Sequence, residues 1–166
     1  MQIEKSPEST DFAALTKVLV VKAKSADDMT RYSALRWLNS FLSHCLPASH
    51  DSMMAFMADL IIAVLPCLSH STKDIKEAAV SCNSRLLSLN LSKHLTSVGI
   101  GPVLTALSSE VASEQQPTRL ESLRWFQVLL QHNKDEVLRQ WDDIMPALLD
   151  ALSASSDAVV KQVCVH

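Results

Sequence analysis

The sequence contains few of the residues that end helices or favour strands. Only two of its 166 residues are Gly and aromatic residues make up 5%, which disfavours a fold built from tight glycine turns or aromatic-rich strands. Apolar residues make up 48% of the chain, and the commonest residue types include Leu, Ala, Ser and Met. This composition is typical of buried helices. We therefore expect an all-α protein with a sizeable hydrophobic core.

The chain also lacks a strong charge of one sign and a long apolar run. Its 15 basic and 18 acidic residues are scattered and leave a net charge of −3, so nothing indicates binding to nucleic acid or to an anionic bilayer. The most apolar run, 53–68, contains Asp59 and Pro66 and is too short to cross a hydrocarbon core of about 30 Å. The first ten residues lack the apolar core of a secretory signal, which predicts a cytosolic location.

Signatures of catalysis and metal binding are missing as well. The four cysteines form no CxxC pair, so we expect free thiols in a reducing compartment: Cys45, Cys67, Cys82 and Cys164. Cys67 with His70, or the loose group of His44, Cys45 and His50, is too small a set to enclose zinc. Neither GxSxG nor HExxH occurs, and the single GxG at residues 99–101 follows no strand. We expect no enzyme activity, no cofactor and no metal.

Apolar residues recur at helical spacing throughout the chain. On the segment 28–46, for example, Leu35, Leu38 and Leu42 fall on one stripe. Two capping boxes are predicted, one at Thr118 and Glu121 and one at Asp74 and Glu77. The pattern predicts helices over 11–24, 28–46, 52–69, 74–91, 98–111, 117–132 and 135–153, and a truncated one from 157 to the end.

The helices repeat as pairs, which favours a solenoid over an ordinary helical bundle. First helices begin near residues 11, 53, 95 and 136, a period of 41 or 42 within the range of about 40–47 typical of HEAT and armadillo repeats. The segment TRYSALRWLNSFL, from Thr30, matches TRLESLRWFQVLL, from Thr118, at six of thirteen positions. We predict a polar tail over 1–10 and an α-solenoid of about four HEAT-type pairs, the last truncated, over 11–46, 53–91, 95–132 and 136–166.

Two sets of residues recur with the repeats and are candidates for a role. Basic residues stand near the start of each second helix, and we interpret them as a ladder that ties neighbouring repeats together; a basic strip for acidic partners is the alternative: Arg31, Lys76, Arg119 and Lys161. Trp37 and Trp125 are repeat-equivalent, so we expect both to pack between repeats, with a role as partner-binding anchors as the alternative.

Three segments in order resemble one family of HEAT proteins. The run ADLIIAVLPCLSHSTKDIKEAAVSCNSRLLSL, the two TRxxxLRW helices and DDIMPALLDALSASSDAVV are together similar to the central HEAT region of the vacuole-morphology scaffold, known in animals as the associated regulator of PIKfyve. The LPxL motif, and a capping residue followed by Val or Ile and then Lys, occur in many HEAT proteins. The resemblance therefore rests on the order in which the three segments occur together. Animal members have a longer polar insertion where this chain has LSKHLTSVGIGPV, which makes it more similar to shorter, plant-like members.

The resemblance implies a function that the residues alone do not show. In that family the scaffold assembles a phosphatidylinositol 3-phosphate 5-kinase and an opposing Sac-type 5-phosphatase on endosomal or vacuolar membranes. Members are several times longer, so we expect this chain to be a fragment that lies between the enzyme-binding ends. The alternatives are another HEAT adaptor in trafficking or microtubule binding and, less favoured, a helical enzyme or lipid carrier. We also expect weak self-association through apolar faces at the ends of the stack.

Overall fold

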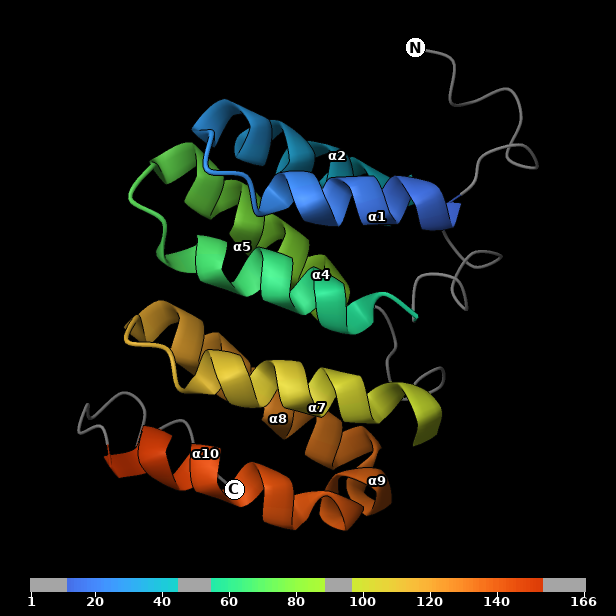
Figure 1. Cartoon of the computed structure of the whole chain (residues 1–166), viewed down its shortest axis with the longest axis vertical. Helices are drawn as coiled ribbons and strands as arrows, with labels where there is room; N and C mark the ends of the chain where they lie inside the picture. The colour runs from blue at the N-terminus through green and yellow to red at the C-terminus, as the bar shows by residue number, and fades with distance from the viewer. Residues whose placement is uncertain (1–11, 45–54, 89–96, 154–166) are drawn as a thin grey trace.

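The computed structural model describes residues 12–44, 55–88 and 97–153, and in these ranges it contains helices and no strands (Figure 1). The helices follow one another as antiparallel pairs, which confirms the predicted all-α solenoid. Their bounds are α1 (Phe12–Ala23) and α2 (Asp28–His44); α4 (Met57–Val64), continued by the short 3-10 helix η3 (Leu65–Ser69), and α5 (Lys73–Ser88); α7 (Ser97–Val111) and α8 (Gln116–His132); then α9 (Lys134–Arg139) and α10 (Trp141–Ser153).

The pairs stack in chain order, so each helix contacts its own partner and its counterparts in the adjacent pairs. First helices α1, α4, α7 and α10 form one layer, with α4 packed on α1 and α7, and α7 packed on α10. Second helices form the other layer, in which α2 lies against α5 and α8 reaches the preceding pair through η3. In the three described ranges, no further helix covers the outer face of either layer or the two ends of the stack.

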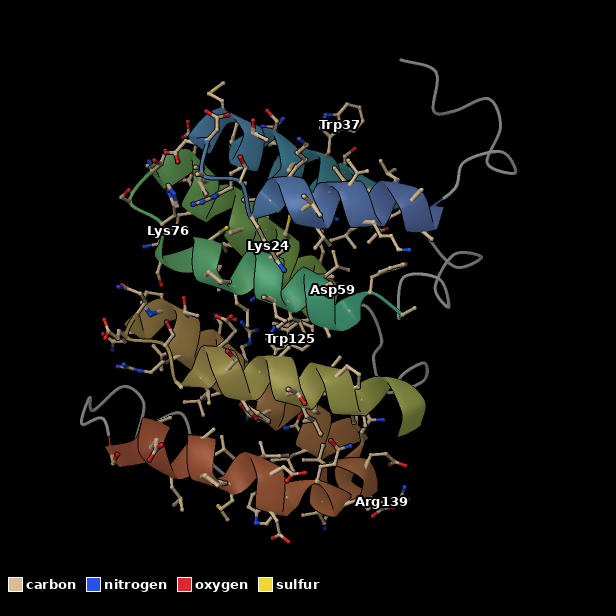
Figure 2. The ribbon with its side chains drawn as sticks, in the orientation of Figure 1. Lys24, Trp37, Asp59, Lys76, Trp125 and Arg139 are labelled. Carbon is tan, nitrogen blue, oxygen red and sulfur yellow. The ribbon has the colours of Figure 1, made fainter. Side chains whose placement is uncertain are left out.

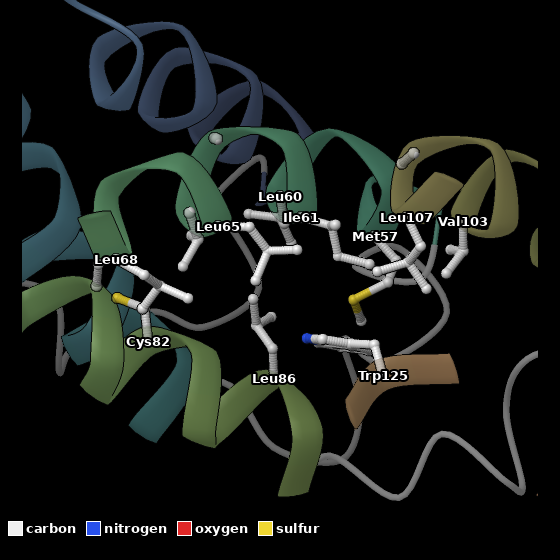
Figure 3. Close-up of a cluster of buried hydrophobic side chains, with 14 of the residues drawn as sticks. Met57, Leu60, Ile61, Leu65, Leu68, Cys82, Leu86, Val103, Leu107 and Trp125 are labelled. Carbon is white, nitrogen blue, oxygen red and sulfur yellow. The ribbon is translucent and has the colours of Figure 1, made fainter. Parts of the chain in front are cut away.

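The core lies between the two layers and runs through the stack without a break. The stripe predicted on the second helix supplies Leu35 and Leu38, which are at most 1% exposed. Further along, Met57, Leu86 and Trp125 meet where two pairs join (Figure 3). Full burial of one such side chain contributes roughly 1.5–3 kcal/mol, so the continuous core is the main source of stability.

Two predicted helices are each divided in the structure. The helix expected over 52–69 is described from Met57, and it changes to 3-10 geometry at Leu65 because Pro66 has no N–H to continue the α-helical ladder. The helix expected over 135–153 is broken at Gln140, where φ is −106° and ψ is 17°. Val137 on α9 and Ile144 on α10 are both buried on either side of this break.

Both predicted capping boxes are wrong. Asp74 is the second residue of α5 (Lys73–Ser88) and so does not stand at the N-cap position. Helix α8 begins at Gln116, its N-cap residue Gln115 makes no side-chain capping hydrogen bond, and Pro117 occupies the first turn, where an N–H is not needed. Thr118 is therefore inside the helix; it is 1% exposed and contacts the preceding pair instead. The expected tail over 1–10 and the expected last helix from 157 lie outside the described residues.

Candidate interaction surfaces and the interfaces between helix pairs

Arg31 and Arg119 close the loop of their own helix pair, so the predicted role of tying neighbouring repeats together is wrong for both. Arg31 donates from Nε and Nη2 to the carbonyl oxygen of Ser25, at 2.9 and 2.6 Å, across the loop between α1 and α2. Arg119 donates from Nη1 to the carbonyls of Ser113 and Glu114, at 3.0 and 3.3 Å, across the loop between α7 and α8. A guanidinium group can bind such loop carbonyls because it offers several N–H donors in a fixed plane.

The other two predicted ladder residues do not extend this pattern. Lys76 is exposed on α5, and Lys161 lies outside the described residues. In the register of the repeated TRxxxLRW motif, 44 positions after Arg31, stands the buried Ile75. Arg31, Lys76 and Arg119 therefore do not all occupy equivalent positions in successive helix pairs.

One asparagine on α2 and one on α5 each make a polar contact with the next helix pair. Asn39 on α2 accepts hydrogen bonds through Oδ1 from Ser81 Oγ at 3.0 Å and from Arg85 Nε at 2.7 Å, both on α5. The amide side chain thus receives two donors from the next pair, one of them charged.

The same contact recurs one pair further along, in a more buried setting. Asn83 on α5 accepts from Trp125 Nε1 at 2.8 Å and donates from Nδ2 to Glu121 Oε2 at 2.8 Å. Asn83 to Trp125 and Asn39 to Ser81 span the same sequence separation of 42 residues. We call these two contacts the asparagine ladder. The signal in the sequence was the recurrence of Asn39 and Asn83 44 residues apart, half the spacing of the repeated TRxxxLRW motif, and it was not among the predicted sites.

The two tryptophans of the repeated motif have opposite environments. Trp125 is 0% exposed in the interface between the second and third pairs, whereas Trp37 is 52% exposed at the first pair. The expected packing role therefore fits Trp125, and the expectation that Trp37 is buried between repeats is wrong. Trp37 lies on the end of the stack and points away from it (Figure 2).

At the ends of the helices, Asp28 joins the first pair to the second. Thr72 Oγ1 donates to Asp28 Oδ2 at 2.7 Å, and His70 Nε2 lies 3.5 Å from Asp28 Oδ1. The Thr72 amide in turn donates to His70 Nδ1 at 3.1 Å. His70 is therefore engaged in this inter-pair contact, and the Cys67 thiol donates to the carbonyl of Ala63 at 3.3 Å.

The described thiols sit in apolar surroundings. Cys82 donates to the carbonyl of Leu35 at 3.1 Å, and burial raises its pKa to about 12. Burial likewise raises the pKa of Cys67. Because the thiolate is the reactive and metal-binding form, neither side chain is prepared for nucleophilic or metal chemistry. In the three described ranges no three His, Cys, Asp or Glu side chains are grouped so as to hold a metal ion.

One acidic group has a raised pKa on the first-helix layer. Glu110, near the end of α7, is half-buried, and this burial raises the pKa of its carboxyl, while the positive charge of Lys24 opposes the rise. Its negative charge in turn contributes to the raised pKa of the Cys67 thiol, for which burial is the main cause.

A groove along α2 and α5 is the candidate protein-binding surface of the second-helix layer. Its volume is about 460 Å³, and its lining includes Tyr32, Arg36, Asp74 and Glu77. Charges of both signs stand beside the phenol ring and the asparagine ladder residue Asn39. This composition suits a polar protein segment better than a small apolar ligand.

In the part of the chain that the structure describes, no helix combines the length and apolar character needed to cross a bilayer.

Comparison with known proteins connects the chain to one group of relatives. It is 35% identical over 162 residues to the VAC14 homologue of Arabidopsis thaliana, covering 98% of this chain and 21% of that protein. It is 23% identical over 165 residues to the VAC14 homologue of Schizosaccharomyces pombe, covering 92% of this chain and 20% of that protein. The resemblance inferred from the sequence is thereby confirmed, and the chain spans about one fifth of the length of these curated relatives.

No protein-family model matches the sequence. No solved structure matches it.

Proposed function

We propose that this chain, which is homologous to a segment of the VAC14 homologues, serves as a spacer in a scaffold of that type. In this role it sets the distance and curvature between binding regions and catalyses no reaction. The single observation that carries the proposal is the asparagine ladder, which fixes successive helix pairs in one register above a continuous core. A stack held in this way transmits a small, constant rotation per pair into the geometry of the whole scaffold.

The partners follow from the family resemblance. We infer that the complete scaffold brings together a phosphatidylinositol 3-phosphate 5-kinase and a Sac-type 5-phosphatase, and so regulates phosphatidylinositol 3,5-bisphosphate. The scaffold acts as a peripheral protein on endosomal or vacuolar membranes. The enzyme contacts lie mainly in regions that this chain does not contain, and the groove along α2 and α5 is its own surface for a polar protein segment.

The proposal is tested by exchanging the segment within a full-length relative. In the Arabidopsis thaliana VAC14 homologue, residues 1–166 of this chain replace the aligned segment, and a flexible Gly-Ser linker of equal residue number is the control. We expect the exchange to preserve co-purification of the kinase with the phosphatase and the linker to abolish it, since a flexible linker sets no fixed distance. If the linker also preserves the complex, the segment is not a spacer.

A pull-down with residues 1–166 as bait gives the complementary result. We expect neither the kinase nor the phosphatase to be retained, although both are retained by the full-length relative run beside it. Retention by residues 1–166 alone would assign a binding surface to what we propose is a spacer. Mass spectrometry of the retained proteins distinguishes this scaffold from a HEAT adaptor of trafficking or of microtubules.

A further inference from the structure

Successive helix pairs are joined differently in the second-helix layer. At the first interface, between the first and second pairs, α2 packs along α5. At the second interface, between the second and third pairs, α8 packs on η3 and, within the described ranges, does not pack along α5 in the same way. The first helices α4 and α7 pack together there, so the second interface is wider in the second-helix layer than in the first-helix layer.

The residues of α5 that face α2 at the first interface are small. Ser81 Oγ donates to Asn39 Oδ1 at 3.0 Å, and Cys82 Sγ donates to the backbone carbonyl of Leu35 at 3.1 Å. Both side chains are short, so the backbones of the two helices must lie close together for these bonds to form. Small side chains at a helix contact favour the shorter interaxial distances within the usual range of about 8–10 Å.

Large side chains stand at the same two positions of the second interface. Trp125 and Phe126 of α8 follow Ser81 and Cys82 by 44 residues, half the spacing of the repeated TRxxxLRW motif. Both aromatic side chains are buried, at 0% and 3% exposure. Figure 3 shows the Trp125 ring extending from α8 towards α5. The ring therefore occupies the space between two second helices that do not approach each other closely.

The asparagine ladder is kept at both interfaces, although the length of the donor changes. Asn39 accepts from the short hydroxymethyl side chain of Ser81, whereas Asn83 accepts from the indole nitrogen at the far side of the Trp125 ring, at 2.8 Å. Asn83 also donates to Glu121 Oε2 at 2.8 Å, so long side chains meet across the second interface. The same acceptor can thus be reached over two different helix separations, according to the size of the donor.

We propose that the donor residue of the asparagine ladder, Ser81 at the first interface and Trp125 at the second, sets the distance between successive second helices. Serine lets α5 approach α2, and the indole holds α8 away from α5 while making the equivalent hydrogen bond. Because the first helices stay packed, this distance sets the local bend of the stack. The inference rests on the proposed spacer function and assigns its curvature to one positioning residue at each interface.

The test measures helix separation in each layer at the second interface. Nitroxide labels at Ser84→Cys and Gln131→Cys report the distance between α5 and α8, and labels at Asp59→Cys and Thr105→Cys report the distance between α4 and α7. All four positions are exposed. Pulsed electron–electron resonance gives each distance, and circular dichroism verifies that every variant is folded.

The labelling requires a background free of other reactive thiols. Cys45 and Cys164 are replaced by Ser, while Cys67 and Cys82 are retained because both are buried. In this background, Trp125→Ser and Trp125→Leu shorten the donor residue by different amounts. Trp125→Phe is the matched control, since it keeps an aromatic ring and removes the indole N–H.

We expect Trp125→Ser to bring the labels on α5 and α8 closer by about 2 Å or more, since interaxial distance follows the side chains at the contact. Trp125→Leu should give a smaller shortening and remains informative if the serine variant does not fold. Trp125→Phe should leave the distance unchanged, and the labels on α4 and α7 should not move in any variant. A folded leucine variant with an unchanged α5–α8 distance would overturn the proposal, because Trp125 would then only fill the core. Equal shortening by phenylalanine would also overturn it, because the hydrogen bond would then set the spacing.

The reciprocal change enlarges the donor at the first interface. Labels at Arg36→Cys and Ser84→Cys report the distance between α2 and α5. We expect Ser81→Leu to lengthen this distance, and Ser81→Thr, which keeps a hydroxyl group and adds one methyl group, to change it much less. No lengthening in a folded Ser81→Leu variant would contradict the role of Ser81. These distances do not depend on which enzymes the complete scaffold binds, so they test the inference separately from the segment exchange that tests the spacer function.

Discussion

Replacing each of the two equivalent tryptophans by alanine should give very different losses of stability. A fully buried tryptophan removes about 150–250 Å² from water, worth roughly 4–6 kcal/mol at about 25 cal/mol per Å². Trp125, at 0% exposure, loses this contribution and also leaves a cavity. Trp37 is 52% exposed, so Trp37→Ala should lose only about half of that contribution, roughly 2–3 kcal/mol. Its removal from the surface leaves no cavity.

The lost hydrogen bond increases the difference. Trp125→Ala removes the donor to Asn83 Oδ1, and Asn83 is itself only 3% exposed. An unsatisfied buried acceptor costs about 1–3 kcal/mol, so we expect Trp125→Ala to lose roughly 5 kcal/mol or more in total. Trp125→Phe retains most of the apolar area, so its loss should be close to the hydrogen-bond contribution alone.

Urea unfolding followed by circular dichroism gives the free energies, and hydrogen exchange measured by mass spectrometry locates the opening. Because helix pairs contact only their neighbours, Trp125→Ala should raise exchange first in α5, α7 and α8. Trp37→Ala should raise exchange only in α1 and α2. Equal losses for the two variants would refute the reasoning, since they would show that burial in this register does not depend on a preceding pair.

Three further predictions concern the thiols, the half-buried carboxyl and the loop-closing arginines. Iodoacetamide should label Cys67 and Cys82 only after unfolding, because burial raises the pKa of both thiols, and peptide mass spectrometry measures the labelling at each site. Burial raises the pKa of Glu110 above 4.5, so its ionisation opposes folding: the unfolding free energy should fall as pH rises from 4.5 through the folded-state pKa. Glu110→Gln should therefore gain stability at neutral pH and none below pH 4, and thermal unfolding at both pH values measures the difference. Arg119→Met should lose about 1.5–3 kcal/mol and expose the α7–α8 loop to protease, whereas a loss no larger than at an exposed arginine such as Arg124 would contradict its loop-closing role.

Helical periodicity in the sequence determines most of the architecture. Leu35, Leu38 and Leu42 have the spacing of one helix face, and the structure buries all three. The repetition of TRxxxLRW at twice the repeat period indicated stacked pairs, because a solenoid must reuse its structural unit. These signals are local or periodic, so they can be read from the amino-acid order alone.

Helix ends were less predictable because they depend on competition between local and tertiary contacts. Thr118 and Glu121 have the spacing of a capping box, yet Thr118 bonds to the preceding pair and Glu121 bonds to Asn83. The break at Gln140 likewise lies between two buried residues, Val137 and Ile144, which pack in the core. Local propensity could not reveal contacts whose partners lie about 40 residues or more away in the sequence.

The sequence by itself determined that Trp37 and Trp125 occupy equivalent positions, because both stand in the same motif at twice the repeat period. Only the tertiary structure decided that one is buried and the other exposed, since burial in a solenoid depends on whether another pair lies over that face. The same holds for Arg31 and Arg119, whose spacing predicted a ladder along the stack and whose side chains instead close their own loops. Equivalent residues share a backbone position, but the contacts they make depend on which atoms the rest of the chain places within their reach.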